Sequence, residues 1–162
     1  MIKFKKIRYK NFLSTGNIPI EVELDKSHTT LIVGSNGSGK STLLDALCYA
    51  LFNKPFRIIK KDQMVNTINN ADTLVEVEFE VGTNQFMIRR GIKPNLFEIY
   101  QNDKLINQDA SSIDYQKYLE QNIMKLNYRS FIQVVILGSS AYEPFMKMKP
   151  RYRREVVEEI LD

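Results

Sequence analysis

The residues best suited to chemistry lie between positions 34 and 42, where glycines alternate with polar side chains ahead of a lysine. The segment matches the nucleotide-binding pattern G-x-x-x-x-G-K-[S/T] at every fixed position, and its residues are Gly34, Ser35, Asn36, Gly37, Ser38, Gly39, Lys40, Ser41 and Thr42. Glycines let successive backbone N–H groups point at a phosphate without a Cβ in the way. A random chain of this length would contain the pattern about once in 200 trials. We call residues 34–41 the phosphate loop.

The side chains that follow the glycines have roles with a nucleoside triphosphate. Lys40 can reach β- and γ-phosphate oxygens, which makes it the candidate catalytic residue, and the Ser41 hydroxyl can ligate Mg²⁺. Thr42 can supply a hydroxyl and an N–H to the α-phosphate. A helix that begins at Lys40 adds the positive end of its dipole at the same place. ATP and Mg²⁺ are therefore the predicted cofactors.

The elements on either side of the phosphate loop must hold it in place. Residues 29–33 end in Leu31-Ile32-Val33, and this continuous apolar run predicts a strand that is buried on both faces. Beyond the loop, apolar side chains recur on one face from Lys40 to about Phe52, which predicts an amphipathic helix. Pro55 ends that helix and opens a basic loop.

The remainder of the chain predicts a small antiparallel meander and further helices. Alternating apolar positions predict strands at about 2–12, 18–24, 75–81, 86–90, 96–101 and 104–107. The first strand changes phase between Lys5 and Lys6, which predicts a bulge. A helix capped by Ser111 or Ser112 follows, then an apolar run from 131 to 137 that we interpret as a strand, and finally a helix that begins at Pro150.

Composition restricts the class of protein. The chain has 162 residues, of which 43% are apolar and 26% charged, and these are globular values. The single cysteine, Cys48, excludes a disulfide framework and is predicted to be a buried core thiol, while the single histidine, His28, is expected in an exposed turn. We expect neither a membrane span nor a signal peptide, because the apolar runs are short and the first residues are basic.

Basic residues gather in three clusters within a net charge of +4. The first cluster is Lys3, Lys5, Lys6, Arg8 and Lys10, the second is Lys54, Arg57, Lys60 and Lys61, and the third is Lys147, Lys149, Arg151, Arg153 and Arg154. Solvated faces explain them as well as a footprint for a phosphate backbone does, because such a footprint requires cations that converge in space. Glu76, Glu78 and Glu80 alternate along one strand and predict a solvent-facing side rather than a metal site.

Longer stretches of the sequence resemble one family. The segments from Phe4 to Ser14 and from Leu31 to Leu47 resemble the N-terminal lobe of the SMC/SbcC-type ABC ATPases of DNA double-strand-break repair. Three further segments, 54–57, 89–99 and 137–138, resemble the phage members of that family, the ATPase subunits of T-even recombination exonucleases. The resemblance covers essentially the whole chain.

The resemblance implies an α/β fold of the P-loop NTPase class, namely the N-terminal lobe of an ABC-ATPase head. This lobe would have a mixed sheet, an antiparallel β meander and a last helix, from about 150 to 162, that begins a coiled coil; residues 1–162 would form a single lobe. The implied partners are a complementary C-terminal lobe, a second head in an ATP-dependent dimer, a metal-dependent nuclease subunit and duplex DNA ends, with no membrane. The expected location is the cytoplasm, that of an infected bacterium if the chain is phage-encoded.

By the same resemblance, residues outside the phosphate loop approach the nucleotide. They are Ser14 and Thr15, after the first strand, and Val65, Asn66 and Thr67, in the basic loop. Two positions depart from the family. Leu13 stands where many relatives carry an arginine, and Ser139 stands where they carry a Q-loop glutamine that ligates Mg²⁺, because Gln133 is out of register.

Two motifs that complete such an ATPase do not occur in this sequence. Nowhere do four apolar residues precede Asp-Glu, and there is no Leu-Ser-Gly-Gly. We therefore expect this chain alone to bind ATP·Mg²⁺ weakly and to hydrolyse it negligibly, as half of an ATPase site. Three other interpretations stay open: a self-contained P-loop kinase of small molecules, a transporter-type ABC subunit, and a DNA-binding module with a vestigial phosphate loop.

Overall fold

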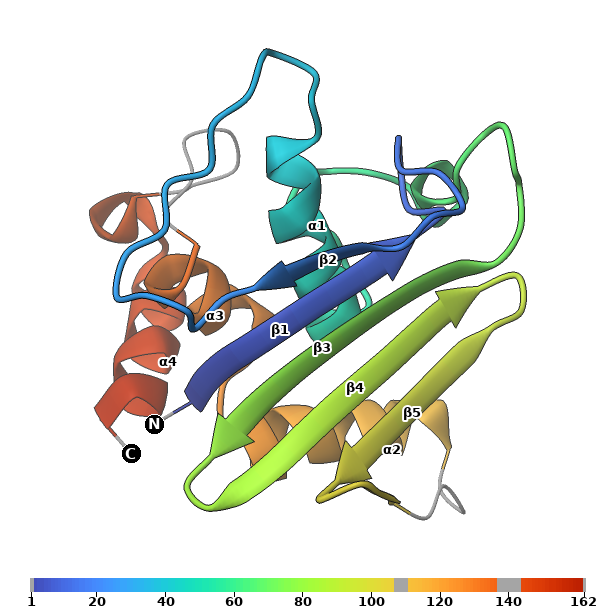
Figure 1. The fold of residues 1–162 in the computed structure, drawn as a ribbon. Helices are drawn as coiled ribbons and strands as arrows, with labels where there is room; N and C mark the ends of the chain where they lie inside the picture. The colour runs from blue at the N-terminus through green and yellow to red at the C-terminus, as the bar shows by residue number, and fades with distance from the viewer. Residues whose placement is uncertain (1, 107–110, 137–143, 162) are drawn as a thin grey trace.

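A six-stranded sheet forms the largest element of the computed structural model, which describes residues 2–106, 111–136 and 144–161. The strand order is β2-β1-β3-β4-β5-β6, and every pair is antiparallel, where a mixed sheet was expected. The strands are β1 (Ile2–Lys10), β2 (Ile20–Glu23), β3 (Thr73–Val81), β4 (Asn84–Ile92), β5 (Leu96–Gln101) and β6 (Lys104–Leu105). Helices lie behind one face of this sheet, and the other face is open (Figure 1).

The described helices agree with most of the predicted positions. They are α1 (Lys40–Phe52), α2 (Ser112–Tyr118), α3 (Tyr128–Val134) and α4 (Pro150–Leu161), and a π-helical segment (Leu119–Met124) continues α2. Short 3-10 turns cover Lys61–Met64 and Phe145–Lys147. The Ser111 side chain caps α2 by accepting the backbone N–H of Asp114 at 3.3 Å, so the predicted cap is confirmed. Pro150 is the first residue of α4, also as predicted.

The core lies between the covered face of the sheet and α1. Val77 of β3 pairs with Ile88 of β4, and the rings of Phe79 and Phe86 stack with centroids 5.6 Å apart. The sequence predicted an amphipathic helix, but ten of the 13 residues of α1 are buried. The helix is therefore central in the core. The predicted bulge is confirmed, because the β1–β3 register shifts between Phe4 and Lys6. The phase slip keeps both halves of β1 in contact with β3.

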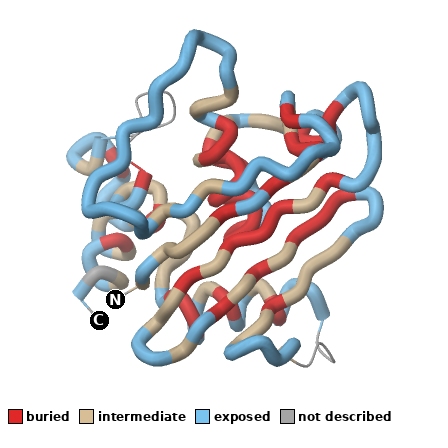
Figure 2. Tube along the Cα trace, viewed as in Figure 1, coloured by how far each residue is buried: buried red, intermediate tan, exposed pale blue. Residues whose placement is uncertain are grey.

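Residues 29–33 are the largest departure from the predicted fold. They form no strand, and Leu31 and Val33 are 84% and 78% exposed rather than buried on both faces. Figure 2 shows the whole segment from 25 to 38 as exposed chain that loops away from the sheet before α1 begins. A strand is formed only beside a partner that accepts its hydrogen bonds, and none of the described strands lies along this segment. The prediction of a buried strand is therefore wrong for this chain.

The apolar run from 131 to 137 is a second departure. Its described part is helical, because α3 covers Tyr128–Val134 and places Gln133 on a helix instead of a strand. The side chain of Asn127 caps this helix by accepting the backbone N–H groups of Arg129 and Ser130 at 2.9 and 3.0 Å. A capping residue directly before a short apolar run favours a helix over a strand. The prediction gave too little weight to this local signal.

Candidate phosphate-binding site

The phosphate loop leads directly into the first turn of α1. Gly37 and Gly39 have φ values of 84° and 89°, in the left-handed region that glycine enters without strain. Gly39 is the N-cap of α1, no side chain caps the helix, and its first turn contains no acidic residue. The first backbone N–H groups of a helix have no partner within the helix. In α1 the backbone N–H of Thr42 donates to the Gly39 oxygen at 3.0 Å, whereas those of Lys40 and Ser41 have no backbone acceptor among the described residues. These two N–H groups can bind an anion, and the helix dipole adds positive potential there.

Lys40 folds back over the loop that precedes it. Its Nζ donates hydrogen bonds to the backbone oxygens of Gly34 and Ser35, at 2.6 and 2.7 Å. The ammonium group is therefore held against the first residues of the phosphate loop. Its three protons can exchange these carbonyl oxygens for those of a bound phosphate.

A cavity of about 450 Å³ opens at this point and combines three parts of the chain. Its lining consists of Leu13, Ser14, Asn36, Gly37, Gly39, Lys40, Ser41, Thr42, Arg57 and Ile59. The structure thus brings Ser14, from the turn after β1, next to the phosphate loop. The side of the cavity at Leu13 is apolar, in keeping with the leucine that stands at the family's arginine position.

Arg57 is the residue of this cavity that sequence reasoning did not place at the site. Its backbone N–H and Nε donate to Asp45 Oδ1 and Oδ2 at 2.9 and 2.7 Å, and Nη2 lies 2.5 Å from Oδ2. Asp45 belongs to α1 and is 0% exposed. A buried carboxylate requires a cationic or hydrogen-bonding partner. An aspartate amid the apolar residues of the predicted helix was therefore the signal that could have located Arg57.

The other residues that the family resemblance implies near the nucleotide are not among those that line this cavity. Thr15 is buried, and its hydroxyl donates to the backbone oxygen of Phe12 at 2.6 Å. Val65 is buried and pairs with Phe12 in an isolated bridge, and Asn66 Nδ2 donates to the backbone oxygens of Leu13 and Thr15 at 3.2 and 3.0 Å. Thr67 is exposed. None of these four residues lines the cavity; Asn66 instead holds the turn that carries Ser14.

Ser41 is the one predicted metal ligand within the described residues, since Ser139 lies outside them. Ser41 is exposed at the wall of the cavity. A search of the described residues finds no group of three His, Cys, Asp or Glu side chains placed to hold a metal ion. Ser41 would hold Mg²⁺ at this site together with oxygens of a nucleotide. None of the described helices is long and apolar enough to cross a membrane.

The remaining candidate nucleophiles are placed as their sequence context predicts. Cys48 is fully buried in α1, and burial raises the pKa of its thiol, so it is a core residue as predicted. His28 lies in the exposed segment before the phosphate loop. Neither residue lines the phosphate-loop cavity.

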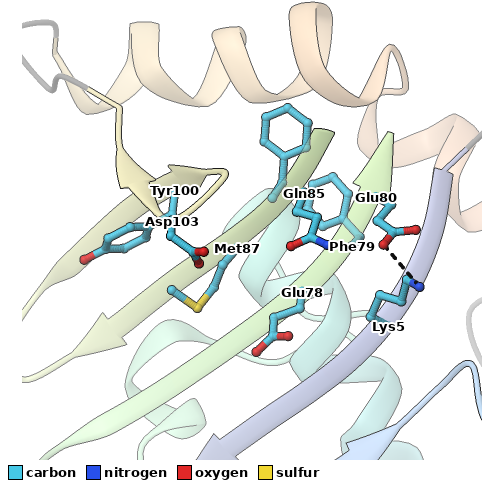
Figure 3. Close-up of a pocket in the computed structure, with 9 residues that line it drawn as sticks. Lys5, Glu78, Phe79, Glu80, Gln85, Met87, Tyr100 and Asp103 are labelled. Carbon is cyan, nitrogen blue, oxygen red and sulfur yellow. Dashed lines mark ion pairs between the residues drawn. The ribbon is translucent and has the colours of Figure 1, made fainter. Parts of the chain in front are cut away.

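The first basic cluster lies largely on the open face of the sheet, where carboxylates neutralise it. Four of its five cations are paired: Lys3 and Lys5 with Asp25 (3.6 and 3.1 Å), Lys5 with Glu80 (3.2 Å), Lys6 with Glu21 (3.3 Å), and Arg8 with Glu76. Figure 3 shows the Lys5–Glu80 pair in a shallow cavity of about 330 Å³ on this face. Cations that already have partners on their own sheet are poor candidates for a phosphate-backbone footprint.

Glu76 departs from the solvent-facing side predicted for this strand. It is 5% exposed and lies between two arginines, Arg8 of β1 and Arg89 of β4, with Arg89 Nε 2.7 Å from its Oε1. The antiparallel register places Glu76 directly opposite both residues. The prediction therefore fails at Glu76, because the strands on both sides bring cations to it.

The sequence matches known proteins along nearly its whole length. A family model described as an AAA domain matches residues 6–162. The chain is 44% identical over 160 residues to exonuclease subunit 2 of Enterobacteria phage T4, a match that covers 99% of this chain and 28% of that protein. It is 31% identical over 162 residues to the DNA double-strand break repair Rad50 ATPase of Methanococcus maripaludis, which covers 97% of this chain and 15% of that protein. The chain thus spans less than a third of the length of these relatives.

Solved structures match the fold at lower identity. One comes from work on ATP-driven dimerization and DNA-stimulated activation of SMC ATPases; it covers 98% of this chain and 99% of its own, with a TM-score of 0.66 and 21% identity. Another is the Smc head domain of Pyrococcus furiosus with an extended coiled coil, bound to the C-terminal domain of ScpA; it covers 99% of this chain and 42% of its own, with a TM-score of 0.67 and 20% identity. The predicted fold, the N-terminal lobe of an SMC-type ABC-ATPase head, is confirmed.

Proposed function

The chain belongs to the AAA domain family, and on that premise we propose that it is the ATP-binding lobe of a DNA repair and recombination ATPase. The names of its relatives, exonuclease subunit 2 and Rad50 ATPase, support this class of protein. In the complete head the protein hydrolyses ATP, and turnover controls the processing of DNA ends by a partner nuclease.

The observation that carries the proposal is the open N-terminus of α1. Free backbone N–H groups, the Lys40 ammonium and the Ser41 hydroxyl all border one cavity, and no acidic residue of the first turn competes for them. Such a set of donors favours a chain of phosphate oxygens over a neutral substrate. None of the described residues that line this cavity is a carboxylate that could activate a small acceptor, and we therefore favour an ATPase lobe over a small-molecule kinase.

Lys40 and Ser41 divide the work on the triphosphate. When a nucleotide enters, Lys40 Nζ leaves the oxygens of Gly34 and Ser35 and donates to phosphate oxygens, while the N–H groups of the phosphate loop bind the β-phosphate. Ser41 holds Mg²⁺, which neutralises charge on the β- and γ-phosphate oxygens when bound. Arg57, held by Asp45, adds a cation to the same cavity.

The exposed segment before the phosphate loop supports a lobe that is completed by another part of the head. Leu31 and Val33 are apolar and exposed. A complementary C-terminal lobe covers them and adds the Asp-Glu pair that holds metal and activates water. A second head supplies the Leu-Ser-Gly-Gly motif across an ATP-dependent dimer. Residues from 150 onward begin the coiled coil, and Val157 and Leu161 are exposed for that contact.

The test is to measure ATP hydrolysis by this chain alone and after co-purification with the complementary C-terminal lobe, each with and without duplex DNA. We expect negligible turnover by the chain alone and clear turnover by the pair. Lys40→Ala should abolish that turnover, whereas the matched control Lys26→Ala should not, because Lys26 is an exposed lysine that pairs with Glu23.

Three results would contradict the proposal. Robust turnover by the chain alone that is abolished by Lys40→Ala would show a self-sufficient enzyme. Transfer of phosphate to a nucleoside or sugar would show a kinase. Duplex binding that ATP leaves unchanged, in a pair that never hydrolyses ATP, would instead identify a DNA-binding module with a vestigial loop.

A further inference from the structure

A second cavity lies at the opposite end of α1 from the phosphate loop. Its volume is about 430 Å³, and Phe52 and Asn53 at the end of α1 line it together with residues of β4, β5 and α2. It shares no lining residue with the phosphate-loop cavity. Since the 13 residues of α1 rise about 1.5 Å each, the two cavities lie roughly 20 Å apart. They are separate sites on one helix.

Arg90 of β4 contributes a buried guanidinium to the wall of this cavity. The residue is 5% exposed, its Nε donates to the Ala50 oxygen at 2.9 Å, and its Nη2 donates to Gln116 Oε1 at 2.7 Å. Its guanidinium carbon lies 3.7 Å from the centroid of the Phe97 ring. All three partners are neutral. Burial lowers the pKa of Arg90 to about 10, because the charged form has lost water and the charge of nearby Glu120 offsets only part of that cost.

Three lysines from separate elements line the same cavity. Lys54 follows α1, Lys61 begins a 3-10 turn and Lys117 belongs to α2. Of these three lysines, only Lys117 has an ion-pair partner among the described residues. Its Nζ lies 3.8 Å from Asp114 Oδ1, and because both side chains are largely exposed this pair contributes little.

Among its described lining residues, the cavity contains a single carboxylate against these four cations. Glu120 lines it, and its Oε1 already accepts a hydrogen bond from Gln116 Nε2 at 2.7 Å. On the open face of the sheet, by contrast, four of the five cations of the first basic cluster have carboxylate partners. Like charges that converge without a counter-ion repel one another, and a bound anion removes that repulsion.

We propose that the cavity between the end of α1 and α2 binds phosphate groups of a duplex DNA backbone. The proposal rests on the proposed function for the identity of the polyanion. Its ligands are a planar arginine and flexible lysines, the donors that proteins use for backbone phosphates. Contacts of this kind position a duplex without reading its sequence, as a protein that acts on DNA ends requires.

The other two basic clusters fit this role less well. The first is neutralised on its own sheet, as described above. The third follows one short stretch of chain around the start of α4, and none of its residues lines either cavity. Of the second cluster, Lys54 and Lys61 meet Arg90 and Lys117 from other elements in this cavity, and convergence is what a phosphate-backbone site requires. Arg57 lies in the phosphate-loop cavity instead.

The experiment measures binding of a short blunt-ended DNA duplex by the full-length protein at salt concentrations from about 50 to 200 mM. The variant is Lys54→Gln with Lys61→Gln, two exposed positions where the change should not disturb folding. We expect about 10-fold weaker binding, and a slope of log K against log salt that is smaller by about 1 to 2 because one or two phosphate contacts are lost. ATP affinity should not change, since neither lysine lines the phosphate-loop cavity.

The matched control is Lys5→Gln with Lys6→Gln, which removes the same charge from paired positions on the open face. Equal losses in the variant and the control would overturn the inference, because net charge alone would then explain binding. A variant that loses affinity for inorganic phosphate but binds the duplex normally would overturn it as well. Failure of the wild-type protein to bind ATP would contradict the proposed function; DNA binding unaffected by the variant, with ATP binding intact, would contradict this inference alone.

Discussion

The meander of β3, β4 and β5 and the segment of residues 25–39 differ in how many of their hydrogen-bonding groups are paired, and in how many of their apolar side chains are buried, within the described chain. In the meander the backbone groups are paired along continuous ladders, the apolar side chains meet α1, and buried Glu76 lies between two arginines. Apart from the ion pairs of Asp25 with Lys3 and Lys5, the segment before α1 has local hydrogen bonds, such as Ser38 N to the Ser35 oxygen at 3.2 Å, and it exposes Leu31 and Val33.

The difference separates stability from chemistry. The meander and α1 form a core that requires nothing from outside the described chain, whereas the phosphate loop is attached to a segment that contributes almost nothing to that core. Substitutions in the meander or α1 should therefore lower stability, whereas substitutions in the phosphate loop should lower nucleotide binding.

The largest expected difference in stability is between Ile88→Ala and Leu31→Ala. Ile88 is fully buried opposite Val77, so its truncation should lower the free energy of unfolding by about 2–5 kcal/mol. Leu31 is exposed, and its truncation should change that free energy by no more than about 0.5 kcal/mol. Urea unfolding of this chain measures both. Similar losses from the two substitutions would show that the segment packs on the core in solution.

Lys40→Ala should produce the opposite pattern, a loss of binding without a loss of stability. Its Nζ donates to two backbone oxygens of the exposed phosphate loop, so the free energy of unfolding should stay within about 0.5 kcal/mol of the wild-type value. Affinity for ATP should fall by about 100-fold or more, as when a principal charge-stabilising donor is removed. Titration with a fluorescent ATP analogue and urea unfolding of the same sample test this, and comparable losses in both would break the separation.

Tyr49 provides a pH-dependent measure of the contact between α1 and the meander. It is fully buried, its hydroxyl lies 3.4 Å from the Gly91 oxygen of β4, and burial raises the pKa of Tyr49 to about 12. A tyrosine with a raised pKa contributes stability that is complete below pH 10 and is lost as the pH rises through 12. Between pH 10 and 12, the free energy of unfolding of Tyr49→Phe should therefore fall by about 2 kcal/mol less than that of the wild type. Parallel pH profiles would show that the hydroxyl is not buried.

The smallest expected difference compares two carboxylates with different surroundings. Glu76→Gln leaves Arg8 and Arg89 without their shared anion, and should lower the free energy of unfolding by about 1–2 kcal/mol. Glu23→Gln removes a partner of exposed Lys26 next to the segment before α1, and should cost no more than about 0.5 kcal/mol. Thermal unfolding of both variants is sufficient. Equal melting temperatures would mean that water penetrates the Arg8–Glu76–Arg89 group.

Local signals explain which parts of the fold could be predicted from the sequence. The start of α1 at Lys40 follows from the glycines before it, and the meander follows from alternating side chains with Gly82 at a positive φ of 62° in its turn. Residues 31–33 carry the pattern of a buried strand, but the pattern cannot tell whether its neighbours belong to the same chain. An apolar run predicts that its surface will be covered, but it does not predict which segment covers it.

Pairs that form between distant segments could not be predicted in the same way. Arg57 reaches Asp45 only because the loop after α1 folds back on that helix, and Glu76 is enclosed only because the register of two strands places arginines beside it. Both partners were visible in the sequence as charges, in a basic cluster and on a strand face that was expected to be solvated. The sequence did not show which of these charges lie close together in space. The place of Arg57 in the cavity and the Arg8–Glu76–Arg89 group were therefore not predicted.

Helix α1 has a closed end and an open end, and this asymmetry determines how its amide protons exchange with solvent. At the closed end Asn53 returns its N–H to the Tyr49 oxygen at 2.9 Å, and the oxygens of Ala50 and Leu51 accept hydrogen bonds from Arg90 and Gln116. At the open end the amides of Lys40 and Ser41 have no backbone acceptor among the described residues, so they exchange with deuterium at nearly the rate of an unfolded peptide. A bound phosphate would slow exchange in the first turn alone. Isotope uptake along this one helix is therefore a measure of nucleotide occupancy that requires no change in the shape of the chain.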